Sequence, residues 1–305
     1  MAARSSNGKA FVVLAGGMDP TTMSTEQVVE ALAGTFKRPS YTPPLLPRVA
    51  MEVLRLSQAP ITMDFSRDLE PVLSEDPLLT AQILRAANSP LMGARSPIRS
   101  IRQALTRLGL RGIRDVVMTV SLRTRVFRTP AYQSELDALF QHSQALGTIA
   151  QELARVTGGE QTFTYMCGLL ADMGIAATLL VFGELPEGAP SLRSLWPAML
   201  RVHEDAAMVV GREWELPEEV LEVIAHHHDL DPHHPQALLI ASLTVAEGLS
   251  LRMGTHLGCH DPAWGPYLDA ERLQRAQDYL GVDDAVLEQV MERCALQLNP
   301  PNAAA

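Results

Sequence analysis

The stretch Gly168-Leu169-Leu170-Ala171-Asp172-Met173-Gly174 places one carboxylate inside an apolar run that is flanked by glycines. An aspartate in this position has two interpretations. It is either an internal cap or polar anchor of a helix, which is the commoner case, or a metal ligand that needs partners from other parts of the chain. The sequence on both sides of the stretch decides how far the second interpretation can be taken.

Helical patterns surround the stretch. A long helix is expected from near Ser134 to Gly158-Gly159, where the glycines end it, and the helix that contains Asp172 is expected to continue to about Val181. Further helices are expected over residues 191–214, 217–228, 235–251, 270–280 and 284–297.

The N-terminal part shows clear helix boundaries as well. Asp76-Pro77 is an N-cap followed by proline at the first helical position, and Ser100 with Gln103 forms a capping box for a helix that ends at Gly109. Other helical segments are expected over 25–36, 47–57 and 113–120. Since no alternating strand pattern of useful length occurs, the sequence predicts an all-α fold with irregular helix packing.

The composition fits a globular protein. The chain has 305 residues, of which 47% are hydrophobic and only 5% aromatic, so the core must be aliphatic. Its three cysteines are far apart and odd in number, which favours reduced thiols. No apolar run approaches the roughly 20 residues that span a bilayer, and no adequate signal peptide is present. We therefore expect a cytoplasmic protein without membrane insertion.

Charge is unevenly distributed. The net charge is −10, which disfavours nucleic-acid binding, yet residues 85–128 contain ten arginines and a single acid, Asp115. The arginines either neutralise the acidic remainder of the chain or bind an acidic protein, a nucleotide second messenger or a nucleic acid. The candidate partner- or anion-binding residues are Arg95, Arg99, Arg102, Arg107, Arg111 and Arg114.

Several helices carry residues that can ligate metal. The candidate set is His142, Asp172, His203, His227 and His228, to which Glu247 can be added. Imidazole and carboxylate groups that converge from several helices suit a borderline divalent ion. Structural interpretations remain for each of them: His142 as a satisfied core histidine, His203 as a first-turn polar residue, and the histidine triplet as the C-terminal end of a helix.

A second group of histidines occupies residues 226–234, where five of nine residues are histidine. Such a segment binds nickel or zinc in vitro, and adventitious surface binding is the favoured interpretation. No nucleophile motif of the Gly-x-Ser-x-Gly type and no phosphate-binding loop occurs.

Together these motifs resemble the HDOD domain, a bacterial signalling module related to the HD metal phosphohydrolases. The likeness covers roughly residues 40–255, and its most specific block runs from Asp76-Pro77 to Asn88-Ser89. The other matching motifs are Leu45-Leu46-Pro47, Pro97-Ile98, Leu108-Gly109-Leu110-Arg111, His142-Ser143, Gly168 to Gly174, His203, Leu216-Pro217 and His227-His228.

The resemblance implies a regulatory role. HD enzymes hold metal through an adjacent His-Asp pair, and many HDOD proteins keep that pair, whereas this chain has Ala171 before Asp172. A glutamate, Glu247, also stands where an aspartate is expected. The metal set thus looks incomplete, so no cofactor is expected beyond one weakly bound divalent ion.

We accordingly expect a non-enzymatic signalling protein that acts by binding a protein partner. The expected domains are an N-terminal extension over 1–39, partly disordered or with one short helix, and an HDOD domain over 40–255. The latter divides into a helical subdomain over 40–130 and an HD-like subdomain over 131–255, and C-terminal helices over 256–305 pack on it. The alternatives are a phosphohydrolase with an altered metal site, and binding of a cyclic dinucleotide or nucleic acid through the arginine-rich segment.

Overall fold

The structure is a computed structural model that describes residues 23–58, 65–89, 92, 97–159, 162–185, 189–256 and 269–298. Within these residues the chain forms helices and no strand, so the predicted all-α class is confirmed. The packed interior is one continuous, mainly aliphatic core.

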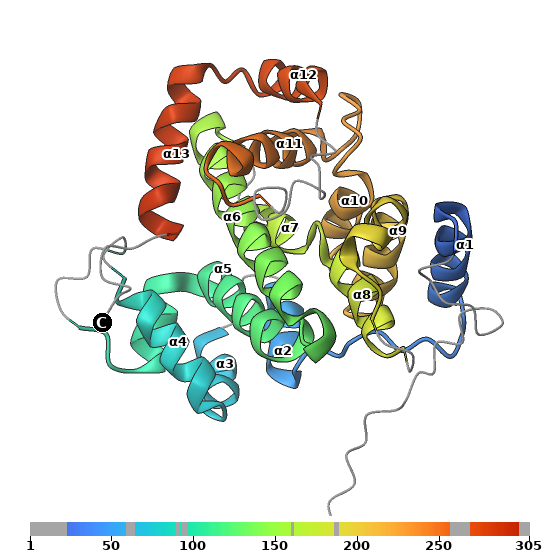
Figure 1. The fold of residues 1–305 in the computed structure, drawn as a ribbon. Helices are drawn as coiled ribbons and strands as arrows, with labels where there is room; N and C mark the ends of the chain where they lie inside the picture. The colour runs from blue at the N-terminus through green and yellow to red at the C-terminus, as the bar shows by residue number, and fades with distance from the viewer. Residues whose placement is uncertain are drawn as a thin grey trace, which may run out of the picture.

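Short helices form the N-terminal part, at the lower left of Figure 1. They are α2 (Arg48–Ser57), α3 (Phe65–Ser74), α4 (Pro77–Ala87) and α5 (Ile101–Ser121), and α2, α3 and α4 all pack against α5. The predicted caps are present, because Asp76 accepts the backbone N–H groups of Leu78 and Leu79 and Ser100 forms a capping box with Gln103. Gly109 breaks α5 with φ 68°, where the sequence predicts the helix to end.

The preceding helix α1 (Thr25–Phe36) packs elsewhere. It lies on α9 (Leu192–Glu213), on the right of Figure 1, and Glu26 pairs there with Arg201 at 3.3 Å. The helix that the sequence predicts in the N-terminal extension is therefore ordered and joined to the later part of the chain. The rest of the extension, residues 1–22, lies outside the described residues.

The central part is built around α6 (Gln133–Thr157), which α7 (Thr164–Leu170) and α11 (Ala237–Arg252) contact. A π-helical turn (Leu122–Val126) and a 3-10 turn (Pro130–Tyr132) lead into α6. Beside these lie α8 (Met173–Gly183), α9 and α10 (Glu218–His226), which pack as neighbours.

Two C-terminal helices close the upper part of Figure 1: α12 (Ala270–Leu280) packs on α11, and α13 (Asp284–Leu298) packs on α6. Their bounds agree with the sequence prediction to within a residue.

The helix α3 was not predicted, and it contains Pro71, which weakens a helical pattern.

The sequence predicts no apolar run long enough to span a bilayer, but the stretch Thr164–Gly183 is long and apolar enough to cross a membrane; 89% of an 18-residue window within it is buried inside the fold. It comprises α7 and α8, which pack against α6 and α9. The burial is that of core helices.

Candidate metal centre

The chain breaks its helix at the stretch that contains Asp172. The sequence predicts one helix through this stretch, and that prediction is wrong: α7 ends at Leu170, α8 begins at Met173, and Asp172 takes the N-cap position of α8. The turn leaves the Asp172 side chain in the interior, 1% exposed.

Both glycines of the stretch are in close backbone contact with other helices. A Cβ on Gly168 would lie 2.6 Å from the Cα of Gly147 on α6, and a Cβ on Gly174 would overlap the carbonyl oxygen of His203 on α9. Only glycine permits such approaches. The contacts therefore place Asp172 between α6 and α9, the helices that carry His142 and His203.

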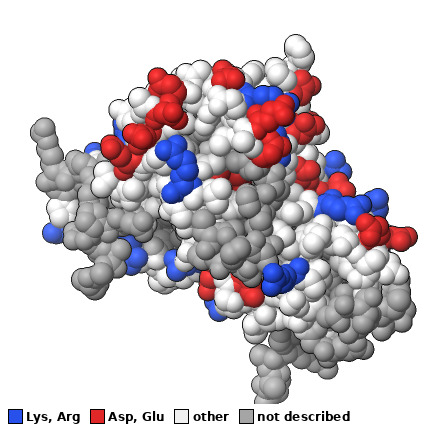
Figure 2. All heavy atoms as spheres, turned by 45° about the horizontal axis from the view of Figure 1, so that its top comes forward, with Lys and Arg blue, Asp and Glu red and all other residues white. Residues whose placement is uncertain are grey.

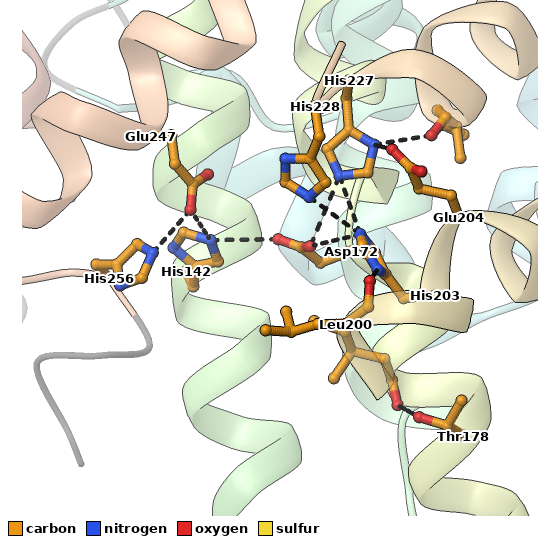
Figure 3. A network of polar contacts seen from close by, with 12 residues as sticks. His142, Asp172, Thr178, Leu200, His203, Glu204, His227, His228, Glu247 and His256 are labelled. Carbon is orange, nitrogen blue, oxygen red and sulfur yellow. Dashed lines mark hydrogen bonds and ion pairs between the residues drawn. The ribbon is translucent and has the colours of Figure 1, made fainter. Parts of the chain in front are cut away.

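On one side of Asp172 three histidines converge, as Figure 3 shows. The Oδ1 atom of Asp172 lies 4.0 Å from His203 Nε2 and 3.8 Å from His227 Nε2. His203 Nε2 lies 3.4 Å from His227 Nε2 and 3.1 Å from His228 Nε2. One ligand atom from each of these four residues lies within 4.8 Å of the others.

The directions of the imidazole rings are fixed by the backbone. His203 Nδ1 lies 2.9 Å from the Leu200 carbonyl oxygen, and His227 Nδ1 lies 2.7 Å from the Ile224 carbonyl oxygen. A carbonyl only accepts, so each Nδ1 carries the hydrogen and each neutral ring presents an Nε2 lone pair. Lone pairs and a carboxylate that face each other need a cation between them, either protons or a metal ion.

On the other side of Asp172 lie His142 from α6, Glu247 from α11 and His256, which follows α11. His142 Nε2 is 3.3 Å from Asp172 Oδ2 and 3.7 Å from Glu247 Oε1, and neither contact is a well-formed hydrogen bond. His256 Nε2 is 2.7 Å from Glu247 Oε1. All three residues are buried.

Protonation in this pocket suits metal ligation at two of the histidines. Burial lowers the pKa of His203 to about 4, with a contribution from the positive charge of His227, and it also lowers the pKa of His228. Burial would raise the pKa of Asp172, but the close approach of the His142 and His227 rings and their positive charges hold it well below its usual range. Neutral imidazoles and an ionised carboxylate are the forms that bind metal.

Two other histidines favour the proton when no metal is bound. Burial lowers the pKa of His142, but the charge of Glu247 and the Asp172 carboxylate outweigh burial and raise it. Asp172 likewise raises the pKa of His227 against the effect of burial. A metal ion would compete with protons for these two rings.

The donor set of Asp172, His203, His227 and His228 fits one divalent ion. Atoms that bind one tetrahedral ion at 2.0–2.2 Å lie about 3.3–3.6 Å apart, and the distances above run from 3.1 to 4.0 Å. Three imidazoles and one carboxylate suit a borderline transition-metal ion better than calcium or magnesium. The hollow beside this set, which Ala171, Glu247 and Arg272 line, has a volume of about 10 Å³, room for one water molecule.

The histidine-rich segment contributes a second group nearer the surface, made of Glu222, His226 and His234, which differs from the buried centre in its hydrogen bonding. His234 Nδ1 accepts the backbone N–H of Gln236 at 3.0 Å, so its Nε2 carries the hydrogen and donates to Glu222 at 3.1 Å. His226 lies beside His234, with ring centroids 5.2 Å apart. A hydrogen bond already uses the nitrogen that a metal would need.

The arginine-rich segment separates into exposed and buried members. Arg99, Arg102, Arg107 and Arg111 are exposed, and Arg102 pairs with Glu70 at 2.7 Å. Arg114 is buried: it pairs with Asp115 at 2.8 Å, donates to the Thr162 carbonyl and lies over the Phe163 ring. Arg114 therefore does not belong to a surface, and Arg95 lies outside the described residues.

Sequence reasoning missed His256. It stands alone after α11, and no spacing connects it to the other histidines. Only the fold shows that it lies against His142, with ring centroids 4.9 Å apart.

Comparison with known proteins identifies the family. The model of the HDOD domain matches residues 44–230, more than half of the chain, so the protein belongs to the HDOD family. A curated relative, an uncharacterised protein of Treponema pallidum (strain Nichols), is 27% identical over 214 residues, which are 67% of this chain. The chain spans 40% of that relative's length.

Solved structures share the fold. An HDOD domain protein of unknown function from Geobacter sulfurreducens has a TM-score of 0.59 at 20% identity and covers 89% of this chain and 97% of its own. A Shewanella amazonensis SB2B protein, named only provisionally as a metal-dependent phosphohydrolase, has a TM-score of 0.61 at 20% identity, with coverage of 84% and 99%. A Marinobacter aquaeolei VT8 protein, named provisionally for signal transduction, has a TM-score of 0.60 at 19% identity, with coverage of 94% and 66%.

Proposed function

We propose that this protein is a non-catalytic regulatory module of bacterial signal transduction, which holds one divalent metal ion as a structural element and acts by binding a protein partner. The observation that carries the proposal is the convergence of Asp172, His203, His227 and His228 on one point. Four protein donors complete a tetrahedral shell, whereas catalytic zinc sites keep one position open for water or substrate.

The surroundings of the pocket support a role without catalysis. Hydrolysis by a two-metal mechanism needs a second ion to share the attacking water. Residue 171, which precedes Asp172, offers only a methyl group, and the adjoining hollow of about 10 Å³ is far too small for a phosphoester.

A cytoplasmic location belongs to the same proposal, because Cys167 and Cys294 are free thiols.

The exposed arginines are the proposed partner surface. Arg99, Arg107 and Arg111 are exposed guanidinium groups on or next to α5, and Arg102 already pairs with the carboxylate of Glu70. An acidic protein surface is the matching partner. A cyclic dinucleotide would use the same groups, since guanidinium also binds phosphate in bidentate geometry.

One experiment addresses binding. The wild type and an Arg99→Glu/Arg107→Glu/Arg111→Glu variant would each be used to capture proteins from a lysate of the source cell. We expect an acidic protein to be enriched by the wild type and lost with the variant. Enrichment of the same proteins by both forms, or of none, would contradict the proposed surface; binding of a cyclic dinucleotide by the wild type alone would replace the protein partner.

A metal-dependent phosphohydrolase is the second candidate, favoured by the retention of His142, Asp172, His203, His227 and His228 in one pocket. The test is hydrolysis of bis-p-nitrophenyl phosphate and of cyclic dinucleotides by untagged protein in added Mn²⁺. We expect no turnover above background. Turnover that Asp172→Asn abolishes would establish the enzyme and refute our proposal.

A further inference from the structure

His256 and Glu247 form a buried pair next to the candidate metal centre. His256 is 1% exposed and Glu247 is 6% exposed, and the Nε2 and Oε1 atoms that join them are 2.7 Å apart. Figure 3 shows the pair on the far side of His142 from the three converging histidines.

The length of this contact distinguishes a hydrogen bond from shared metal ligation. Two atoms that bind the same ion at 2.0–2.2 Å stand about 3.3–3.6 Å apart in a tetrahedral site and about 3.0 Å apart at a right angle. A separation of 2.7 Å is the length of a charge-assisted hydrogen bond. His256 Nε2–H therefore donates to the Glu247 carboxylate instead of ligating an ion beside it.

This hydrogen bond matters because Glu247 lies next to His142 and, through it, next to the candidate metal centre. Glu247 Oε1 lies 3.7 Å from His142 Nε2, which in turn lies 3.3 Å from Asp172 Oδ2. These three residues could hold a second ion beside the first, and His142, Glu247 and His256 also offer ligand atoms that lie within 4.8 Å of one another. Ala171 lines the same hollow as Glu247, but it supplies no further donor, because its side chain is a methyl group.

We infer that His256 takes the place of a second metal ion: its N–H holds the Glu247 carboxylate and so limits the pocket to one ion. The inference rests on the proposed one-ion centre and adds the residue that sets its stoichiometry. His256 is a positioning residue that acts through Glu247.

The test counts the ions that each form of the full-length, untagged protein takes up. Metal-free protein is titrated with Mn²⁺, free Mn²⁺ is followed by electron paramagnetic resonance, and folding is checked by circular dichroism. We expect one Mn²⁺ per chain for the wild type and two for His256→Ala, with a spin-coupled spectrum from the two adjacent ions.

Matched variants separate the hydrogen bond from packing. His256→Gln keeps an N–H donor and should stay at one ion, while His256→Phe keeps the ring volume without a donor and should bind two. The phenylalanine variant also serves if the alanine variant does not fold. His233→Ala, which removes an exposed histidine, should remain at one.

The opposite results would overturn the inference. Two ions in the wild type and one in His256→Ala would make His256 a ligand, and one ion in all folded variants would make it a packing residue. A wild type without any ion would instead refute the proposed one-ion centre itself, which distinguishes the two failures.

Discussion

His203 lies in surroundings that keep its imidazole neutral, and its neighbours explain why. Burial and the positive charge of the neighbouring His227 lower the pKa of His203 to about 4. His227 carries that charge because its own pKa is raised. The sequence could suggest His203 as a ligand, but not the direction of its ring, because the Leu200 carbonyl that fixes this direction is a backbone feature.

The lowered pKa of His203 predicts acid sensitivity of the metal-free protein. A histidine of an unfolded chain has a pKa of about 6.5, so between pH 6.5 and 4 the unfolded state binds more protons and stability falls with the pH. Between pH 7 and pH 5 this group should account for about 2 kcal/mol of lost stability.

Urea unfolding of the metal-free wild type and of His203→Gln at both pH values measures the difference. The variant should lose about 2 kcal/mol less than the wild type over this range. An equal loss in the two proteins would show that His203 does not titrate in this way.

Arg114 illustrates a residue whose role sequence could not assign. The charge pattern predicts a place among the surface arginines, yet its guanidinium is 1% exposed and pairs with Asp115. Replacing it with methionine leaves the Asp115 carboxylate buried without its cation, which should lower the free energy of unfolding by about 3–5 kcal/mol.

The matched control is Arg107→Met, at an exposed position on the same helix, where a change within about 0.5 kcal/mol is expected. Denaturant titrations of both variants give the comparison. Similar stabilities would mean that the buried pair contributes nothing.

Among the elements, the break between α7 and α8 matters most for the site. An apolar run continues on both sides of Ala171 and Asp172, so sequence predicts one helix there; the interhelical contacts of Gly168 and Gly174, which flank the break, are not encoded in the local sequence. By contrast, the boundaries of α4 and α5 were predictable, because Asp76 and Ser100 cap them through local hydrogen bonds.

Gly174→Ala should displace α8 from α9. The added methyl group would overlap the His203 carbonyl oxygen, and overpacking of this kind costs about 1–3 kcal/mol. Since His203 would move with its backbone, metal affinity should also fall, by about tenfold or more by analogy with changes to residues that orient ligands.

The control is Gly34→Ala on α1, where a new Cβ meets nothing within 4 Å. This change should be neutral or slightly stabilising, by up to about 1 kcal/mol. Thermal unfolding and Mn²⁺ titration of both variants test this prediction. If Gly174→Ala keeps the Tm and the Mn²⁺ affinity of the wild type, the close contact between Gly174 and His203 is not needed.

Over the whole molecule, charge is mixed on the face that Figure 2 shows, where acidic and basic side chains lie among each other.

The all-α class and most helix bounds followed from the sequence because capping and amphipathic patterns are local. The packing of α1 on α9 and the approach of His256 to Glu247 did not, because they join segments that are distant in the chain.

A bound ion should stabilise the entire fold, since its ligands come from α9, from the C-terminal end of α10 and from the break before α8. At a free ion concentration of 100 times Kd the gain is about 2.7 kcal/mol. Thermal unfolding of metal-free protein with and without added Zn²⁺ or Mn²⁺ should show a raised Tm in the wild type and none in Asp172→Asn. An equal rise in both would locate the ion elsewhere.

The metal content of untagged protein, measured by elemental mass spectrometry after metal loading and desalting, tests the proposed one-ion centre most directly. We predict about one divalent transition-metal ion per chain in the wild type, less than a tenth of that in Asp172→Asn and in His227→Ala, and no loss in His233→Ala. A wild type that retains no ion, or that retains two, would contradict the one-ion centre.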